Sequence, residues 1–205
     1  MSHPLPPHAP THITYAGACG CGSCGLNRTE VKCPLCQKMC PSLEMRQHMG
    51  SHILHNPSLF TTSNPCGFCG AEAGLCRSWL ETSASTVKPR TKCQLLGGVA
   101  GEGALKYNHA SAKKMSGTAL CTNHLVECEF CAPEQNQQRP VFWSHNLSHH
   151  HNCMHSSHAK PPEAVVGELE RELVKTVGSG KGLTKDQKKK LSSYLAAAKV
   201  AAVLP

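Results

Sequence analysis

Four side chains that bind soft metal ions lie close together in the sequence. Cys33 and Cys36 flank a Pro-Leu pair, and after eleven intervening residues His48 and His52 follow with three residues between them. Two thiolates from a tight turn and two imidazoles one helical turn apart can converge on one tetrahedral zinc ion, with no coordination position left open. The spacing therefore predicts a ββα-type zinc finger, which is a structural site.

The helix expected to carry these two histidines has an apolar side. Met45, Met49 and Ile53 follow the i, i+3, i+4 spacing that places them beside the imidazoles. Both imidazoles would then face the Cys-Pro-Leu-Cys turn. The alternative is an ordinary amphipathic helix with two surface histidines.

The composition argues against one large hydrophobic core. Aromatic residues make up only 4% of the 205 residues, and 17 glycines and 14 prolines are scattered along the chain. Such a chain needs something other than burial to hold its fold, and metal ions can supply it. We therefore expect a small metal-stabilised α+β fold built from several modules.

The 14 cysteines and 14 histidines indicate either disulfide bonds in a secreted protein or metal sites in a reducing compartment. The first residues contain no apolar run that resembles a signal peptide, and no stretch of 18 apolar residues could span a membrane. We therefore expect free thiols, zinc as the cofactor, no membrane contact and a nuclear or cytoplasmic location, with disulfides as the alternative.

Changes of composition divide the chain into five parts. Residues 1–27 are rich in Pro, His, Gly and Ala and are expected to form a flexible arm. The parts expected after it are a zinc finger in 28–58, a cysteine-rich zinc-knuckle segment in 59–124, a second zinc finger in 125–158 and a helical hairpin in 159–205. As an alternative, Cys21 and Cys24 could join Cys33 and Cys36 in a four-thiolate ribbon, which would leave the two histidines without a metal.

The cysteine-rich segment contains the zinc-knuckle sequence Cys-Gly-Phe-Cys-Gly at residues 66–70. Its last glycine, Gly70, permits the positive φ that the backbone needs after the second thiolate. The sequence beyond the knuckle looks like loops. The ligands expected for this site are Cys66, Cys69, Cys93 and Cys121, with Cys76 or His109 as substitutes.

The second finger contains another CxxC pair, Cys128 and Cys131, followed by a histidine-rich stretch. A helix in that stretch would present two imidazoles to the thiolates, as in the first finger. Spacing alone leaves two ligand pairs open: His151 with His155, and His150 with His155.

Cysteine and histidine are absent after residue 160, and two helices are expected there. The first should run from Pro161 through Val177 with one apolar stripe, and residues 178–182 should end it. Thr184 and Gln187 form a capping box for the second. The resulting hairpin could pack on itself, or it could serve for dimerisation or partner docking.

The formal net charge of +8 suggests some affinity for polyanions, but the basic residues are spread along the chain. Exceptions are Lys185 and the run Lys188–Lys190. Arg46 and this lysine patch could support weak, salt-sensitive association with nucleic acid.

Several motifs within residues 31–158 resemble a group of zinc-finger proteins that are abundant in mushroom-forming fungi. The motifs are Pro65-Cys-Gly-Phe-Cys-Gly70, then Cys121-Thr-Asn123 followed by Cys128-x2-Cys131, then Trp143-x2-Asn146-x3-His150-x4-His155. In that family they hold zinc ligands of finger-like modules. The resemblance implies His150 with His155 in the second finger, and Cys93 with Cys121 in the central site. The sequence after Cys93 departs from the family, which usually has an aromatic residue or proline there.

Other functions can be compared at the level of single residues. A zinc enzyme is not expected, since the chain has no HExxH sequence and no His-x-Glu upstream of the residue 66–69 knuckle. Specific DNA reading is not expected either, because the base-reading positions of the first finger fall near Pro41, Glu44 and Gln47. The main alternative is a RING-like, ubiquitin-ligase-type interaction module with ligands Cys66, Cys69, Cys121, His124, Cys128 and Cys131.

The sequence therefore predicts a zinc-binding interaction or regulatory module. Its expected partner is an unidentified protein, with weak nucleic-acid association in addition, and the sequence leaves its oligomeric state open. Zinc should drive folding, because thiolates and neutral imidazoles that bind the ion are brought together only in the folded state.

Overall fold

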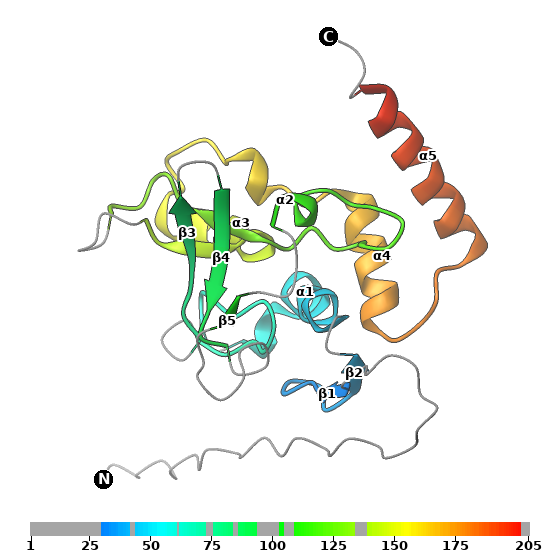
Figure 1. Cartoon of the computed structure of the whole chain (residues 1–205), viewed down its shortest axis with the longest axis horizontal. Coiled ribbons are helices and arrows are strands. Elements are labelled where there is room, and N and C mark those ends of the chain that lie inside the picture. Colours follow the sequence, from blue (N-terminus) through cyan, green and yellow to red (C-terminus); the bar gives the residue numbers. More distant parts are fainter. Residues whose placement is uncertain are drawn as a thin grey trace.

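The computed structural model describes residues 30–41, 44–60, 62–72, 76–83, 86–93, 103–104, 109–133 and 139–201. The expected flexible arm, with Cys21 and Cys24, lies outside this part of the chain. The described residues form a small α+β fold in which short antiparallel sheets are combined with helices (Figure 1). None of the helices in the described part is long and apolar enough to cross a membrane.

The first module has two short strands followed by a helix, in the order expected of a ββα finger. Strand β1 (Glu30–Lys32) pairs antiparallel with β2 (Met39–Pro41), and α1 (Met45–His55) follows. The apolar residues predicted for the helix form a buried core with the strands: Val31, Cys33, Cys40, Met45, Met49 and Ile53. A 3₁₀ turn, η2 (Pro57–Leu59), ends the module.

The central segment contains a sheet where loops were expected. Strand β3 (Ser78–Ser83) pairs with β4 (Thr86–Thr91), and β4 also pairs with β5 (Gly103–Ala104). The strands carry Trp, Val and several Thr, which suit a pleated, half-exposed surface. Serine, lysine and proline residues within the same strands conceal this strand pattern in the sequence. A short helix, α2 (His109–Ala112), follows the sheet.

The second finger repeats the order of two strands and a helix. Strand β6 (Leu125–Glu127) pairs antiparallel with β7 (Val141–Trp143), and α3 (Ser144–Met154) begins directly after β7. Phe142 and Leu147 form a small core with Cys128 and with Ala164 from the segment that follows.

The C-terminal helices differ from their expected positions. Pro162–Ala164 form only a 3₁₀ turn, η3, and the first α-helix, α4 (Glu168–Gly178), begins later than predicted. Gly167 before it is extended, with φ −61° and ψ 150°. The second helix is α5 (Lys185–Ala201), and its predicted capping box is confirmed. Thr184 and Gln187 exchange hydrogen bonds of 3.1 and 3.2 Å between side chain and backbone N–H.

The tail does not fold as a separate hairpin. Helix α4 packs along α1 of the first finger, whereas α5 points away from the body of the protein (Figure 1). Leu173 of α4 and Leu191 of α5 share a core with Met115 and Leu120, which follow α2. Two short amphipathic helices thus gain stability from surfaces outside the tail.

Candidate metal centres

Cysteine and histidine side chains gather in three groups, each of which could hold one metal ion. The groups are Cys33, Cys36, His48 and His52; Cys66, Cys69, Cys76 and Cys93; and Cys128, Cys131, His150 and His155. In each group one ligand atom per residue lies within 4.8 Å of all the others. The residues of one group are not interleaved with those of another along the chain, so each group belongs to one module.

The first cluster is assembled by a tight turn and one helix. The N–H of Cys33 donates to the carbonyl of Lys38 and Gln37 donates back to Cys33, which closes the turn over 2.8 and 2.9 Å. His48 and His52, on one side of α1, point their Nε2 atoms at the thiols, with sulfur–nitrogen distances of 3.2 and 3.7 Å. Ligand pairs around tetrahedral zinc are separated by about 3.3 to 3.8 Å, as its bond lengths require. The spacing therefore fits zinc.

The protonation states of this cluster also suit a cation. Burial raises the pKa of the Cys33 thiol to about 11 and lowers the pKa of His48 and of His52. Without an ion, the imidazoles are thus held neutral with free lone pairs, and the thiol keeps its proton. A zinc ion can replace that proton and stabilise the buried thiolate.

The outer nitrogen of His48 is held by the C-terminal tail. Its Nδ1 donates to the carbonyl oxygen of Gly178, at the end of α4, over 2.8 Å. Metal-binding histidines usually have such a partner, because it fixes the ring and leaves Nε2 free as the ligand. His52 Nδ1 is buried without a hydrogen-bond partner.

The central cluster contains Cys76 in place of the expected Cys121. Cys76 lies two residues before β3 and Cys93 two residues after β4, and Ser78 of β3 is paired with Thr91 of β4. The hairpin therefore brings the two thiols side by side, opposite the knuckle. Cys76 and Cys93 lie equally far from two strands of equal length. This symmetry was the sequence signal for Cys76 as the fourth ligand.

The knuckle of the central cluster repeats the turn of the first. Cys66 donates to Ala71 and Gly70 donates to Cys66, each over 2.8 Å, and Gly70 has the predicted positive φ, at 72°. Gln37 occupies the equivalent position in the first turn with φ 64°. Two CxxC turns of the same geometry thus face their partners from two modules.

The four central thiols interact strongly with each other. The Sγ atoms of Cys69 and Cys76 are 3.2 Å apart. Hydrogen bonding to Cys66, followed by other thiol contacts and burial, raises the pKa of Cys69 and of Cys93, whereas hydrogen bonding from Cys69 lowers the pKa of Cys66. A divalent cation stabilises buried thiols that lie this close together, because it binds them as thiolates and neutralises their charge.

The third cluster selects one of the two histidine pairs left open by spacing. Cys131 Sγ lies 3.3 Å from His150 Nε2 and 3.2 Å from His155 Nε2. The ring of Phe142 stacks on His150 with a centroid distance of 3.7 Å. Burial lowers the pKa of His150 to about 4, so the imidazole is neutral at physiological pH and can act as a ligand.

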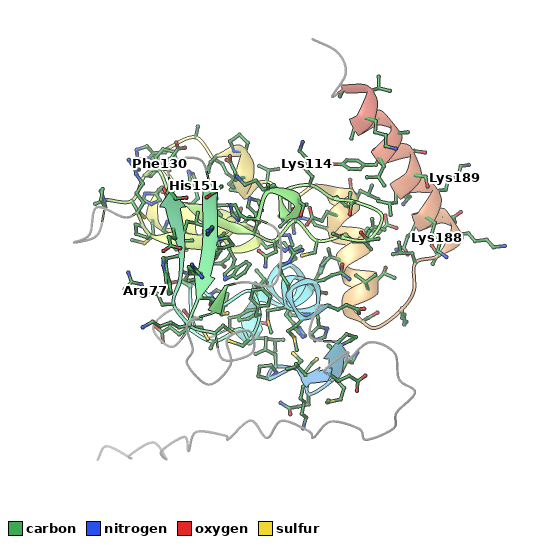
Figure 2. The ribbon with its side chains drawn as sticks, viewed as in Figure 1. Arg77, Lys114, Phe130, His151, Lys188 and Lys189 are labelled. Carbon is green, nitrogen blue, oxygen red and sulfur yellow. The ribbon has the colours of Figure 1, made fainter. Side chains whose placement is uncertain are left out.

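His151 is turned away from this cluster. Its ring lies against Phe130 at a centroid distance of 5.6 Å, and the two are drawn close together in Figure 2. Both of its ring nitrogens are buried without a hydrogen-bond partner. The pair formed by His150 and His155 is the one that the family resemblance implied.

The ligands of a RING-like module are not brought together as that alternative requires. A cross-brace interleaves its metal-binding pairs, whereas the pairs here are used one after another along the chain. His124 donates from Nδ1 to the carbonyl of Thr122 and lies against His109, with ring centroids 5.8 Å apart. Within the described part of the chain, neither histidine belongs to a four-ligand cluster. Cys121 lies elsewhere, beside His145 and Glu170.

Disulfide bonds, the alternative to metal sites, do not occur among the described cysteines, all of which are free. Comparison of the chain with protein-family models, curated proteins and solved structures found no match in any of the three. The functional interpretation therefore depends on the clusters themselves.

Proposed function

We propose that this protein is a zinc-stabilised interaction module, in which three structural zinc ions join two finger-like units and a central knuckle. The observation that supports it is the completeness of the clusters: each has four Cys or His donors and so needs no water or substrate as a ligand. Zinc with four protein ligands stabilises folds, whereas catalytic zinc keeps one position open. The proposed role is therefore structural.

A protein partner is favoured over specific DNA binding. Helix α1, which would read bases in a DNA-binding finger, packs against α4. Arg46, the basic side chain of this helix, donates to the carbonyls of Cys121 and Asn123 over 2.8 and 2.7 Å. A side chain bonded in this way is not free to contact phosphate. A nuclear or cytoplasmic location belongs to the same proposal, because free thiols require a reducing compartment.

Weak association with nucleic acid is a second candidate, and it would use α5. Lys188 and Lys189 extend from this helix away from the body of the protein (Figure 2). Lys190 is instead paired with Glu172 at 2.8 Å. Lysines on a projecting helix can contact phosphates without reading sequence.

The structural role is tested by counting metal ions in the zinc-loaded full chain with native mass spectrometry. We expect Cys36→Ser, Cys69→Ser and Cys131→Ser each to lose one zinc, because each removes a ligand from a different cluster. His124→Ala is the matched control and should lose none. Loss of zinc from His124→Ala would instead support the RING-like arrangement.

Chelation tests whether zinc stabilises the fold. Each structural zinc contributes on the order of 10 kcal/mol of apparent folding free energy, so its removal should abolish the folded circular-dichroism spectrum. A chelated sample that stays folded would contradict the proposal.

The nucleic-acid candidate is tested separately by titrating labelled duplex at low and moderate salt. Binding that appears at low salt and weakens in the double variant Lys188→Gln, Lys189→Gln would support it. No binding at low salt would eliminate it and leave the protein partner.

A further inference from the structure

Cys121, His145 and Glu170 form a fourth group of metal-binding side chains, outside the three clusters. Their ligand atoms lie within 4.8 Å of one another, and all three residues are buried. Cys121 precedes β6, His145 lies in the first turn of α3, and Glu170 lies in α4. The group therefore sits where the second finger, the tail and α1 meet.

The hydrogen bonds of Glu170 define which nitrogen of His145 carries a proton. Glu170 Oε1 accepts from the His145 Nε2 at 2.8 Å and from the Thr122 N–H at 2.6 Å, and the Thr122 hydroxyl also donates to the carboxylate. Burial alone would raise the pKa of Glu170, but these hydrogen bonds outweigh it and lower the pKa. Because both Thr122 donors point at the carboxylate oxygens, Glu170 acts as the acceptor, and Nε2 of His145 is the nitrogen that donates to it.

The other nitrogen of His145 is left with a free lone pair. The side chain is fully buried, and Nδ1 has no hydrogen-bond partner. An unpaired polar atom in the interior costs free energy unless something binds it. An imidazole held at one nitrogen by a carboxylate and free at the other is the arrangement found at metal-binding histidines.

The thiol of Cys121 converges with this lone pair. A Cβ placed on Gly50 of α1 would lie 3.0 Å from Cys121 Sγ and 3.0 Å from His145 Nδ1, so both atoms face the same point beside the glycine. Cys121 is only 1% exposed. A thiolate and an imidazole therefore approach one dry position from two elements.

We propose that Cys121 Sγ and His145 Nδ1 are the ligands of a fourth metal site, which takes Cu⁺, with Glu170 orienting the imidazole. Thiolate and imidazole donors suit this soft ion, which two ligands can hold, whereas zinc takes four. The site would join the segment before β6 to α3, with α4 attached through Glu170, and it does not depend on the three four-ligand clusters.

A nucleophilic triad of Cys, His and Glu would contain the same residues in the same order of contact. Such a triad needs an accessible sulfur. Cys121 is 1% exposed and His145 is 5% exposed, so the sulfur is closed to substrates. Burial therefore favours metal binding over catalysis.

The test compares metal content in a background that lacks Cys153 and the three cysteines of residues 19–24. Cys153 is exposed, with Sγ 3.7 Å from His149 Nε2, and could bind an ion by itself, so Cys19, Cys21, Cys24 and Cys153 are replaced by serine. The full chain is loaded with zinc, and a second sample then receives one equivalent of Cu⁺ under anaerobic, reducing conditions. Native mass spectrometry counts the ions in each.

Two variants remove the proposed ligands. Cys121→Ser deletes the thiolate, and His145→Gln can keep the hydrogen bond to Glu170 but has no second ring nitrogen. Cys40→Ser is the control, since Cys40 is buried but belongs to no cluster. Should Cys121→Ser fail to fold, His145→Gln still tests the site.

We expect the background protein and Cys40→Ser to hold one ion more than either ligand variant, as one copper added to three zincs. Equal ion counts in the background and in the folded ligand variants after copper is added would overturn the fourth site. The difference in ion count between the background protein and the ligand variants tests the fourth site. The number of zinc ions that the ligand variants retain tests the proposal of three structural zincs, so the two proposals can fail independently.

Discussion

His48 and Gly178 are joined by a hydrogen bond of 2.8 Å from the imidazole Nδ1 to the carbonyl oxygen, although 130 residues separate them in the chain. The carbonyl belongs to the last residue of α4, and the imidazole belongs to the first metal cluster. The bond fixes the ring with Nε2 toward Cys36, 3.2 Å away. Docking of the tail and metal binding by the first finger should therefore stabilise each other.

Gly178→Ala is expected to weaken this link. A Cβ at Gly178 would lie 2.3 Å from Ser51 Cβ and 2.5 Å from Ser51 Oγ, so α4 would have to move away from α1. Overpacking of this kind lowers the free energy of unfolding by about 1–3 kcal/mol. Loss of the carbonyl partner should reduce the zinc affinity of the first cluster by about 10-fold. Urea unfolding and competition with a chromophoric chelator measure the two effects. Gly182→Ala, which has nothing within 4 Å, should change neither.

Gly67→Ala is expected to separate the central knuckle from the second finger. A Cβ at Gly67 would lie 2.4 Å from the ring of Trp143, which is buried and packs edge-on against Phe68 at 5.1 Å. Because the indole has no room to move, the free energy of unfolding should fall by about 1–3 kcal/mol. Thermal unfolding of the zinc-loaded protein measures this change. Gly117→Ala, in open space, is the control. Equal melting temperatures for the two variants would contradict the packing described.

Gln37 and Gly70 occupy the same position of two similar turns, and exchanging their residue types should have opposite effects. Gln37 has φ 64°, a conformation that costs side-chain-bearing residues about 1 kcal/mol. Gln37→Gly should therefore raise the free energy of unfolding by up to about 1 kcal/mol. The gain is reduced by the loss of the hydrogen bond that the Gln37 side-chain amide donates to the Pro34 carbonyl.

Gly70→Ala is the reverse change. It places a Cβ at φ 72° and 3.0 Å from Phe60, so the free energy of unfolding should fall by at least about 1 kcal/mol. Chemical unfolding of both variants at saturating zinc compares them. If the free energy of unfolding fell by a similar amount in both variants, the positive φ of Gln37 would not be a source of strain in the first turn.

Zinc affinity of the first cluster should fall steeply as pH falls. Burial raises the pKa of Cys33 to about 11, so zinc must displace a proton from this thiol. Burial lowers the pKa of His48 and of His52, so the imidazoles release none near neutral pH. The proton that Cys33 releases contributes a change of about 10-fold in apparent affinity per pH unit between about pH 7 and pH 8.

Chelator competition at several pH values measures this slope. The variant Cys33→His removes this thiol and should make the slope shallower by about 10-fold per pH unit. A slope that stays the same in this variant would mean that Cys33 binds zinc without losing a proton.

Local features of the fold could be predicted from the sequence because their signals lie within a few residues of each other. The helix that presents Met45, Met49 and Ile53 on one side, the positive φ of Gly70 and the capping box of Thr184 and Gln187 all depend on short-range spacing. The histidines of the first finger are brought to their CxxC turn for the same reason.

Features that depend on strand pairing or on contacts between distant segments could not be predicted. Cys76 joins the central cluster because β3 and β4 form a hairpin that the sequence conceals, and Cys121 is thereby left for another position. The start of α4 at Glu168 also follows from packing, since Ala164 is held in the core of the second finger.

The sequence by itself thus determined which residues can hold metal and how each CxxC turn and helix is built, because ligand spacing and helix periodicity are local properties. Only the tertiary structure decided which thiol completes the central cluster, that α4 covers α1, and that His145 meets Cys121. The first outcome depends on the pairing of β3 with β4, which the composition of these strands conceals. The other two depend on the burial of surfaces that are far apart in the chain, and residue spacing carries no record of them.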